Sequence, residues 1–170
     1  MHSFFALNVE TETQREINKW SILRLPDKGI RFSENTFNIR LCGFAAPGAQ
    51  RIEDLAREVD NLAATRIEII LDTLCFFPRH GEVKLTSITT PTDLGYLVDR
   101  LRKLLNQLNI KTSHRPYQPY ITLLRDYPEE HFVDSDGSTF LIKPVSMSLY
   151  QSTPNNKNFP YVELLNWEVG

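Results

Sequence analysis

The sequence predicts an α+β fold, with mostly antiparallel sheets and helices packed outside them. Short apolar or alternating runs typical of strands recur along the chain, separated by amphipathic helical segments. Several neighbouring strands are joined by short turn-like segments such as Pro78 to Gly81, which favours antiparallel pairing. A strand–helix–strand order occurs in both halves, so we expect two lobes related by a rough twofold axis.

Two strand–helix pairs make up the first half. Phe4 to Val9 predicts a strand, and Thr11 with Gln14 three residues later forms a capping-box pattern for the next helix. That helix is expected to bury Ile17, Trp20 and, as a further candidate, Leu23. Phe37 to Ala45 predicts an alternating strand, with one face carrying Ile39 and Leu41 and the other Asn38, Arg40 and Cys42. The next helix has its apolar positions at Ile52, Leu55, Ala56, Val59 and Leu62.

The second half contains the clearest helix. A strand from Ile67 to about Phe77 and another from Val83 to Ile88 precede it. Thr90 is the expected N-cap, with Pro91 at the first helical position. The apolar stripe of the helix is Leu94, Leu97, Val98, Leu101, Leu104, Leu105 and Leu108. Three further strands are expected at Tyr120 to Arg125, Phe140 to Gln151 and Tyr161 to Val169. No linker separates the halves, so residues 1–170 are interpreted as one domain.

Composition excludes several classes of protein. Of the 170 residues, 41% are hydrophobic and 24% charged, which is typical of a soluble globular protein. The net charge of −2 argues against a protein that coats DNA or RNA through many phosphate contacts. Cys42 and Cys75 lie in apolar runs and are expected to be reduced, buried thiols. No metal-binding spacing and no cofactor motif occurs, so neither a metal nor a cofactor is expected.

The chain also lacks a signal-peptide pattern and a membrane span. Its first residues have no basic region, and the apolar run ends at Val9. No segment approaches the roughly 20 apolar residues of a spanning helix. We therefore expect a cytoplasmic protein with no membrane partner, and we expect a monomer, although the sequence leaves the oligomeric state open.

Matching tetrads lie about half the chain apart. The first is Asn38-Ile39-Arg40-Leu41, and the second is Tyr120-Ile121-Thr122-Leu123. Positions i and i+2 of a strand face the same side, so the polar residues of each tetrad share one face. The segment from Arg115 to Arg125, RPYQPYITLLR, resembles the Arg-Pro-aromatic-x-Pro-His-Ile-Thr-Leu-x-Arg segment of a known family. Phe4-Phe5-Ala6-Leu7, Glu34-Asn35, Ser148-Leu149-Tyr150 and Trp167 add further similarity.

On these motifs the chain resembles the 2H phosphoesterase superfamily, in particular the bacterial RNA 2',3'-cyclic phosphodiesterases once called 2'-5' RNA ligases. The resemblance implies a bilobal fold with a central cleft. In active members each tetrad is His-x-Thr-x: one histidine acts as general base, the other as general acid, and the threonines hold the phosphate oxygens. Here Asn38 and Tyr120 replace the histidines and Arg40 replaces the first threonine, while Thr122 remains.

These replacements change the expected chemistry. An Asn amide does not exchange a proton near neutral pH, and the ordinary pKa of Tyr is near 10. Each general acid or base contributes ~10²–10⁴-fold, so the two-histidine hydrolysis is expected to be lost. The resemblance instead implies an anion site. Its expected phosphate-binding residues are Asn38, Arg40, Tyr120, Thr122 and Arg125, and its expected ligand is a nucleotide or an RNA-terminal phosphate.

Each of these residues also has a simpler interpretation. Tyr120 and Thr122 can be ordinary strand residues, and Asn38 and Arg40 can be solvated positions on an exposed sheet face. Arg125 can pair with Asp126, Glu129 or Glu130. Two alternative functions stay open: an active phosphodiesterase or ligase with a rebuilt site, and an interaction protein with an abandoned cleft. In a rebuilt site, His114 is the best substitute histidine; the others are His2, His80 and His131.

Overall fold

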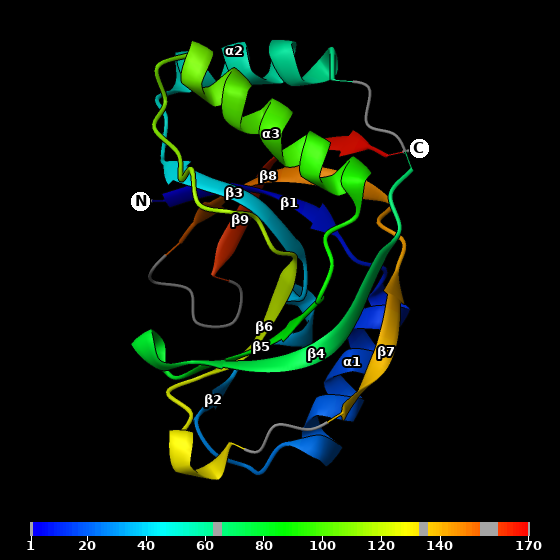
Figure 1. The fold of residues 1–170 in the computed structure, drawn as a ribbon. Coiled ribbons are helices and arrows are strands. Elements are labelled where there is room, and N and C mark those ends of the chain that lie inside the picture. The colour runs from blue at the N-terminus through cyan, green and yellow to red at the C-terminus, as the bar shows by residue number, and fades with distance from the viewer. Residues whose placement is uncertain (1, 63–65, 133–135, 154–159, 170) are drawn as a thin grey trace.

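The chain folds into two antiparallel sheets and three α-helices (Figure 1) within residues 2–62, 66–132, 136–153 and 160–169, which the computed structural model describes. The predicted α+β class, with antiparallel sheets and helices outside them, is confirmed. In these ranges no helix is both long enough and apolar enough to cross a membrane.

The first sheet joins strands from the two ends of the chain. Its order is β3-β1-β8-β9, and every neighbouring pair is antiparallel. The strands are β1 (His2–Asn8), β3 (Ile39–Ala45), β8 (Ser146–Ser152) and β9 (Tyr161–Glu168). The second sheet has the order β2-β6-β5-β4-β7, again antiparallel throughout. Its strands are β2 (Ile30–Arg31), β4 (Ile69–Phe77), β5 (Glu82–Thr86), β6 (Tyr120–Arg125) and β7 (Asp136–Ile142).

Two of the helices cross from one sheet to the other: each packs against the sheet that does not contain the strand before it. Helix α1 (Thr11–Arg24) follows β1 of the first sheet but packs against β7 of the second. Helix α3 (Thr92–Gln107) follows β5 of the second sheet but packs against β3 of the first, beside α2 (Ala49–Asp60), as Figure 1 shows. Most buried apolar side chains of both sheets and all three helices form one continuous cluster, and Phe4, Ala6 and Tyr150 form a second, smaller one. This crossing supports the interpretation of residues 1–170 as one domain, which stays a prediction.

A bulge in β3 changes which side chains reach the core. Ala6 pairs with Arg40 but Phe5 pairs with Cys42, so Leu41 has no partner of its own in β1. Because one extra residue reverses the alternation of a strand, Cys42 lies on the same side as Phe5 and joins the main core. The prediction that Cys42 shares a face with Arg40 is therefore wrong. Both cysteines are free thiols, Cys42 buried and Cys75 half-buried.

The predicted start of α1 is one residue too late. Thr11 is the first helical residue, Glu10 occupies the N-cap, and no side chain caps the helix. Gln14, expected in a capping box, is buried instead and donates a hydrogen bond to the carbonyl of Phe37 at 3.2 Å. Leu23 is 88% exposed, so its predicted burial is also wrong.

The predicted start of α3 is one residue too early. Pro91 occupies the N-cap position and Thr92 begins the helix. The Oγ1 of Thr90 donates to the carbonyl of Tyr117 at 3.2 Å, so this hydroxyl stabilises a distant loop rather than the helix end. Because Tyr117 is far from Thr90 in sequence, a local sequence pattern does not predict this hydrogen bond.

Three strand predictions also need correction. The single strand expected from Phe140 to Gln151 is two, β7 and β8, and Pro144 lies between them. Proline has no N–H to donate to a sheet, which explains the break. β5 ends at Thr86 rather than Ile88, which is 78% exposed. The two-residue strand β2 was not predicted because it is held by its pairing with β6.

Candidate functional site

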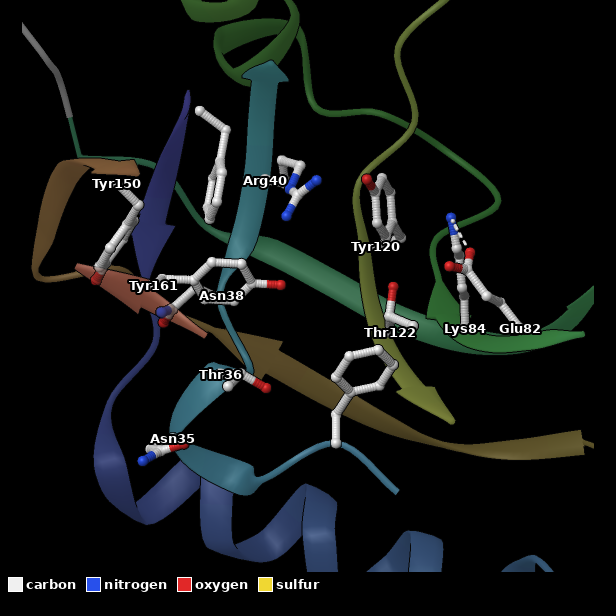
Figure 2. Close-up of a pocket in the computed structure, with 12 residues that line it drawn as sticks. Asn35, Thr36, Asn38, Arg40, Glu82, Lys84, Tyr120, Thr122, Tyr150 and Tyr161 are labelled. Atoms are coloured by element: carbon white, nitrogen blue, oxygen red, sulfur yellow. Dashed lines mark ion pairs between the residues drawn. The ribbon is translucent and has the colours of Figure 1, made fainter. Parts of the chain in front are cut away.

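A cavity of about 190 Å³ lies between the two sheets. Its lining side chains come from β1, β3, β8 and β9 of the first sheet, from β5 and β6 of the second, and from the segment that leads into β3. We refer to it as the first cavity. Figure 2 shows the side chains of β3 and β6 facing each other across it.

Four of the five predicted site residues line this first cavity. Asn38, directly before β3, and Arg40 within it come from one side, and Tyr120 and Thr122 of β6 come from the other (Figure 2). Each pair is spaced i, i+2, so both members share one strand face, while the apolar residues between them are buried. The structure thus brings the polar positions of both tetrads together. Their role in binding phosphate stays a prediction.

Arg125, the fifth predicted residue, does not line the cavity. It is exposed at the end of β6. The carboxylates of Asp126, Glu129 and Glu130 do not lie within salt-bridge distance of it, and neither does any other carboxylate in the described ranges. The alternative ion pair is therefore not formed in this structure, and the role of Arg125 in binding phosphate stays a prediction.

Asn38 is held in place through its carbonyl oxygen. Its Oδ1 accepts hydrogen bonds from the backbone N–H of Val9 at 3.1 Å and from Nε2 of the buried Gln14 at 3.4 Å. Both donors lie on the side chain's carbonyl end, so the Nδ2 hydrogens are left for a partner in the cavity. Asn38 is therefore oriented as a hydrogen-bond donor.

Arg40 is positioned by aromatic rings rather than by a carboxylate. Its guanidinium carbon lies 3.9 Å from the ring centroid of Phe4 and 5.9 Å from that of Tyr161. No carboxylate of the described residues lies within 4.0 Å of it. A guanidinium held by the face of a ring keeps its N–H edges available, so Arg40 can donate to an anion in fork geometry.

Tyr117 attaches the loop before β6 to the backbone of β3. Its O–H donates to the carbonyl of Arg40 at 3.0 Å. Burial raises the pKa of Tyr117, so the phenol stays protonated and remains a donor. This bond holds the Arg40 backbone next to the segment that carries Tyr120.

Sequence analysis missed a charged pair in the cavity. Lys84 and Glu82 of β5 both line it, and their side chains form an ion pair at 3.1 Å (Figure 2). The ammonium of Lys84 also lies 4.1 Å from the ring centroid of Tyr120, and Lys84 pairs with Thr122 across the sheet. The only local signal is the Glu-x-Lys alternation in GEVKLT. That signal does not reveal that β5 lies beside β6.

One wall of the cavity is aromatic. The ring of Phe4 stacks on Tyr150 with centroids 5.5 Å apart and meets Tyr161 edge-on at 4.9 Å. The O–H of Tyr150 donates to Oδ1 of Asn8 at 2.5 Å. Burial is the main cause that raises the pKa of Tyr150. This wall offers an apolar surface next to the polar residues of β3 and β6.

No histidine of the described chain lines the first cavity. His114, the best candidate for a substitute, is exposed and lines neither the first cavity nor the neighbouring one. His80 lines a neighbouring cavity, and His131 ends a short 3-10 helix. His2 lies near Arg40; burial first and then the charge of Arg40 lower the pKa of His2. Within the described ranges, no group of three or more His, Cys, Asp or Glu side chains could hold a metal ion.

Comparison with known proteins identifies the architecture. The chain is 24% identical over 167 residues to the RNA 2',3'-cyclic phosphodiesterase of Escherichia coli, covering 98% of this chain and 95% of that protein. A crystal structure of E. coli LigT with 3'-AMP matches with a TM-score of 0.87 at 22% identity, covering 99% and 97% of the two chains. The chain has the fold of this LigT structure. The predicted resemblance to the RNA 2',3'-cyclic phosphodiesterases is confirmed by a likeness in sequence and fold that spans the whole chain.

A solved structure from another bacterium agrees in fold. The Thermus thermophilus protein TT0787 matches with a TM-score of 0.80 at 17% identity, covering 99% and 98% of the two chains. No protein-family model matches the sequence. The likeness in fold therefore covers nearly the full length of the chain, at low sequence identity.

Proposed function

We propose that the first cavity binds the phosphate of a nucleotide or of an RNA 2',3'-end and that the usual two-histidine hydrolysis is lost. The observation that carries the proposal is the lining of the cavity: Asn38, Arg40, Tyr120 and Thr122 meet there without an imidazole from the described residues. The site keeps its donors for an anion and lacks the two imidazoles of the usual mechanism. The carboxylate of Glu82, which also lines the cavity, is paired with Lys84 at 3.1 Å.

The donors fit a phosphate group. Arg40 supplies a cation that no described carboxylate neutralises, and Asn38 supplies an oriented amide N–H. Tyr120 and Thr122 add hydroxyl donors from the opposite strand. Charge-assisted hydrogen bonds contribute about 1.5–3 kcal/mol each. After the cost of association, micromolar to millimolar affinity for a small phosphate ligand is expected.

The aromatic wall favours a nucleotide over free phosphate. Phe4, Tyr150 and Tyr161 lie beside the polar residues, and stacking of a base on an aromatic ring contributes ~1–3 kcal/mol. E. coli LigT, with the same fold, has been crystallised with 3'-AMP. We extend this class of ligand to the present chain as part of the proposal. The cytoplasmic location and monomeric state stay predictions.

A rebuilt active site is the second candidate. The observation that favours it is the ammonium of Lys84, 4.1 Å from the ring of Tyr120. A cation beside a phenol is a starting point for new acid–base chemistry, and Arg40 would then stabilise the charge that develops on phosphate. This candidate predicts turnover, whereas the binding proposal predicts none.

The test of binding is calorimetric titration at low salt with uridine 3'-phosphate and uridine 2',3'-cyclic phosphate. We expect micromolar to millimolar binding that Arg40→Ala weakens roughly ten- to a hundredfold, as loss of one charge-assisted bond implies. Arg100→Ala is the control, because Arg100 is an exposed residue of α3 that lines neither this cavity nor its neighbour. Absence of binding at millimolar ligand, or unchanged binding in Arg40→Ala, would favour the interaction-protein alternative.

A further inference from the structure

A second, larger cavity of about 490 Å³ adjoins the first. The two share Arg40, Glu82, Lys84 and Tyr120 in their linings, so they lie side by side, and a ligand that occupied both would have to pass these four side chains. Nothing in the proposed binding of a single phosphate uses this second cavity.

The second cavity is strongly cationic. Arg79, Arg102 and Arg115 line it, in addition to the shared Arg40 and Lys84. Its one carboxylate, Glu82, is already paired with Lys84 at 3.1 Å. No described carboxylate lies within 4.0 Å of any of the four arginines. The whole chain has a net charge of −2, so this concentration of positive charge is a local feature rather than a result of composition.

The three additional arginines come from separate parts of the fold. Arg79 belongs to the 3-10 helix after β4, Arg102 to α3, and Arg115 to the loop before β6. Arginines that only keep a surface soluble are usually interspersed with acidic residues. Here the fold gathers arginines from distant segments around one hollow, which is typical of a site for an anionic ligand.

Arg102 provides an independent sign of a missing partner. Its Nε is buried and has no hydrogen-bond acceptor within the part of the chain that the structure describes. Buried N–H groups are nearly always paired, because leaving one unpaired costs stability. Because this Nε has less than 1 Å² of exposed surface, the Arg102 side chain would have to shift to bring it to an anion in the second cavity.

We propose that the second cavity binds a further phosphate of the same ligand whose terminal phosphate occupies the first. This inference rests on the proposed function. It narrows the ligand to a molecule with two separated phosphate groups: a short oligonucleotide that ends in a phosphate, or a pyrophosphate-linked dinucleotide with a terminal phosphate. A mononucleotide would fill only the first cavity.

The test compares three ligands by calorimetry at low salt: uridine 3'-phosphate, uridylyl-uridine 3'-phosphate and NADP⁺. We expect a two-phosphate ligand to bind at least tenfold more tightly than the mononucleotide. If that ligand is uridylyl-uridine 3'-phosphate, the slope of the logarithm of the binding constant against the logarithm of the salt concentration should steepen by ~0.7 for each added phosphate contact. The double variant Arg79→Ala/Arg115→Ala should abolish this advantage and leave the mononucleotide affinity within twofold. Both residues are exposed, so the fold should tolerate their replacement.

Arg102→Gln, which keeps most of the side chain's packing, should reduce the same advantage, whereas the control Arg100→Ala should not. A higher affinity for uridylyl-uridine 3'-phosphate than for the mononucleotide identifies an RNA-like ligand. A higher affinity for NADP⁺ alone identifies a pyrophosphate-linked ligand. Either result supports the second site. Equal affinity for all three ligands, or an advantage that survives the double variant, would overturn the second site and leave the first intact. Binding of none of them would overturn the proposed function as well.

Discussion

At the scale of single residues, the orientation of Asn38 depends on groups outside the cavity. The amide of Gln14 comes from α1, and the N–H of Val9 follows β1. Together they fix which end of the Asn38 amide accepts and which donates. A binding role for Asn38 therefore requires these neighbours as well as the residue itself.

Replacing Gln14 tests this dependence. Gln14→Leu removes the donor to Asn38 and to the carbonyl of Phe37, and it leaves that carbonyl unpaired in a buried position. We expect the free energy of unfolding to fall by about 1–3 kcal/mol. We also expect binding of uridine 3'-phosphate to weaken several-fold, because Asn38 is then held only by the N–H of Val9. Urea unfolding and calorimetry measure the two effects. The exposed Gln107→Leu is the control, and equal effects in both variants would refute a positioning role.

His2 gives the stability of the protein a dependence on pH. Burial and then the charge of Arg40 lower the pKa of His2 from its ordinary value of 6.5. The unfolded chain therefore binds this proton more readily than the folded one, and stability falls as pH drops below about 6.5. An anion bound at Arg40 offsets the repulsion, so the pKa of His2 should rise on binding.

The proton NMR titration of His2, with and without uridine 3'-phosphate, measures this shift. We expect an upward shift on binding, and a similar upward shift in ligand-free Arg40→Ala. His114, which is exposed and lies outside both cavities, is the internal reference. A His2 titration that does not respond to the ligand would contradict placement of the anion beside Arg40.

At the scale of elements, the site depends on how β3 and the loop before β6 are joined. The hydrogen bond from Tyr117 to the carbonyl of Arg40 links them, and Gln118 adds a bond from its Nε2 to the carbonyl of Ser87 at 2.9 Å. The polar residues of the two tetrads belong to these two segments. Their distance across the cavity is therefore set by a few side-chain-to-backbone contacts.

Tyr117→Phe removes one of these contacts without changing the shape of the side chain. We expect the free energy of unfolding to fall by about 0.5–1.5 kcal/mol, the net contribution of one hydrogen bond. Phosphate binding should weaken modestly, because the backbone of Arg40 is less constrained. Tyr96→Phe is the matched control, since Tyr96 is 64% exposed on α3. If urea denaturation gave the same stability for Tyr117→Phe and the parent chain, this role of Tyr117 would be wrong.

Elements governed by local pattern were predictable from the sequence. Strand β6 has the predicted bounds, Tyr120 to Arg125, and the apolar stripe of α3 is buried as expected from Leu94 to Leu105. Features that depend on the pairing of distant segments could not be predicted from the sequence. Cys42 lies on the face opposite to the predicted one because of a bulge in the pairing of β3 with β1. Lys84 lines the site because β5 lies beside β6. A single sequence contains no signal for either pairing.

At the scale of the whole molecule, the arrangement of charge matters more than its total. The net charge of −2 argues against a surface that coats nucleic acid, but it does not reveal a cationic hollow. The additional arginines of the second cavity, Arg79, Arg102 and Arg115, come from three segments, and of these only Arg115 belongs to a sequence motif. The tetrads could be identified in the sequence from the resemblance to a known family. That the additional arginines lie around one cavity could be seen only in the structure.

We propose that the first cavity holds a cyclic or terminal phosphate without hydrolysing it. The most direct measurement is phosphorus NMR of uridine 2',3'-cyclic phosphate incubated with the protein. We predict a shifted or broadened signal from the bound ligand and no conversion above a buffer control, because Asn38 and Tyr120 stand where the usual mechanism has its two histidines. Conversion at an enzyme-like ~1–10³ s⁻¹, lost in Tyr120→Phe or His114→Ala, would contradict it.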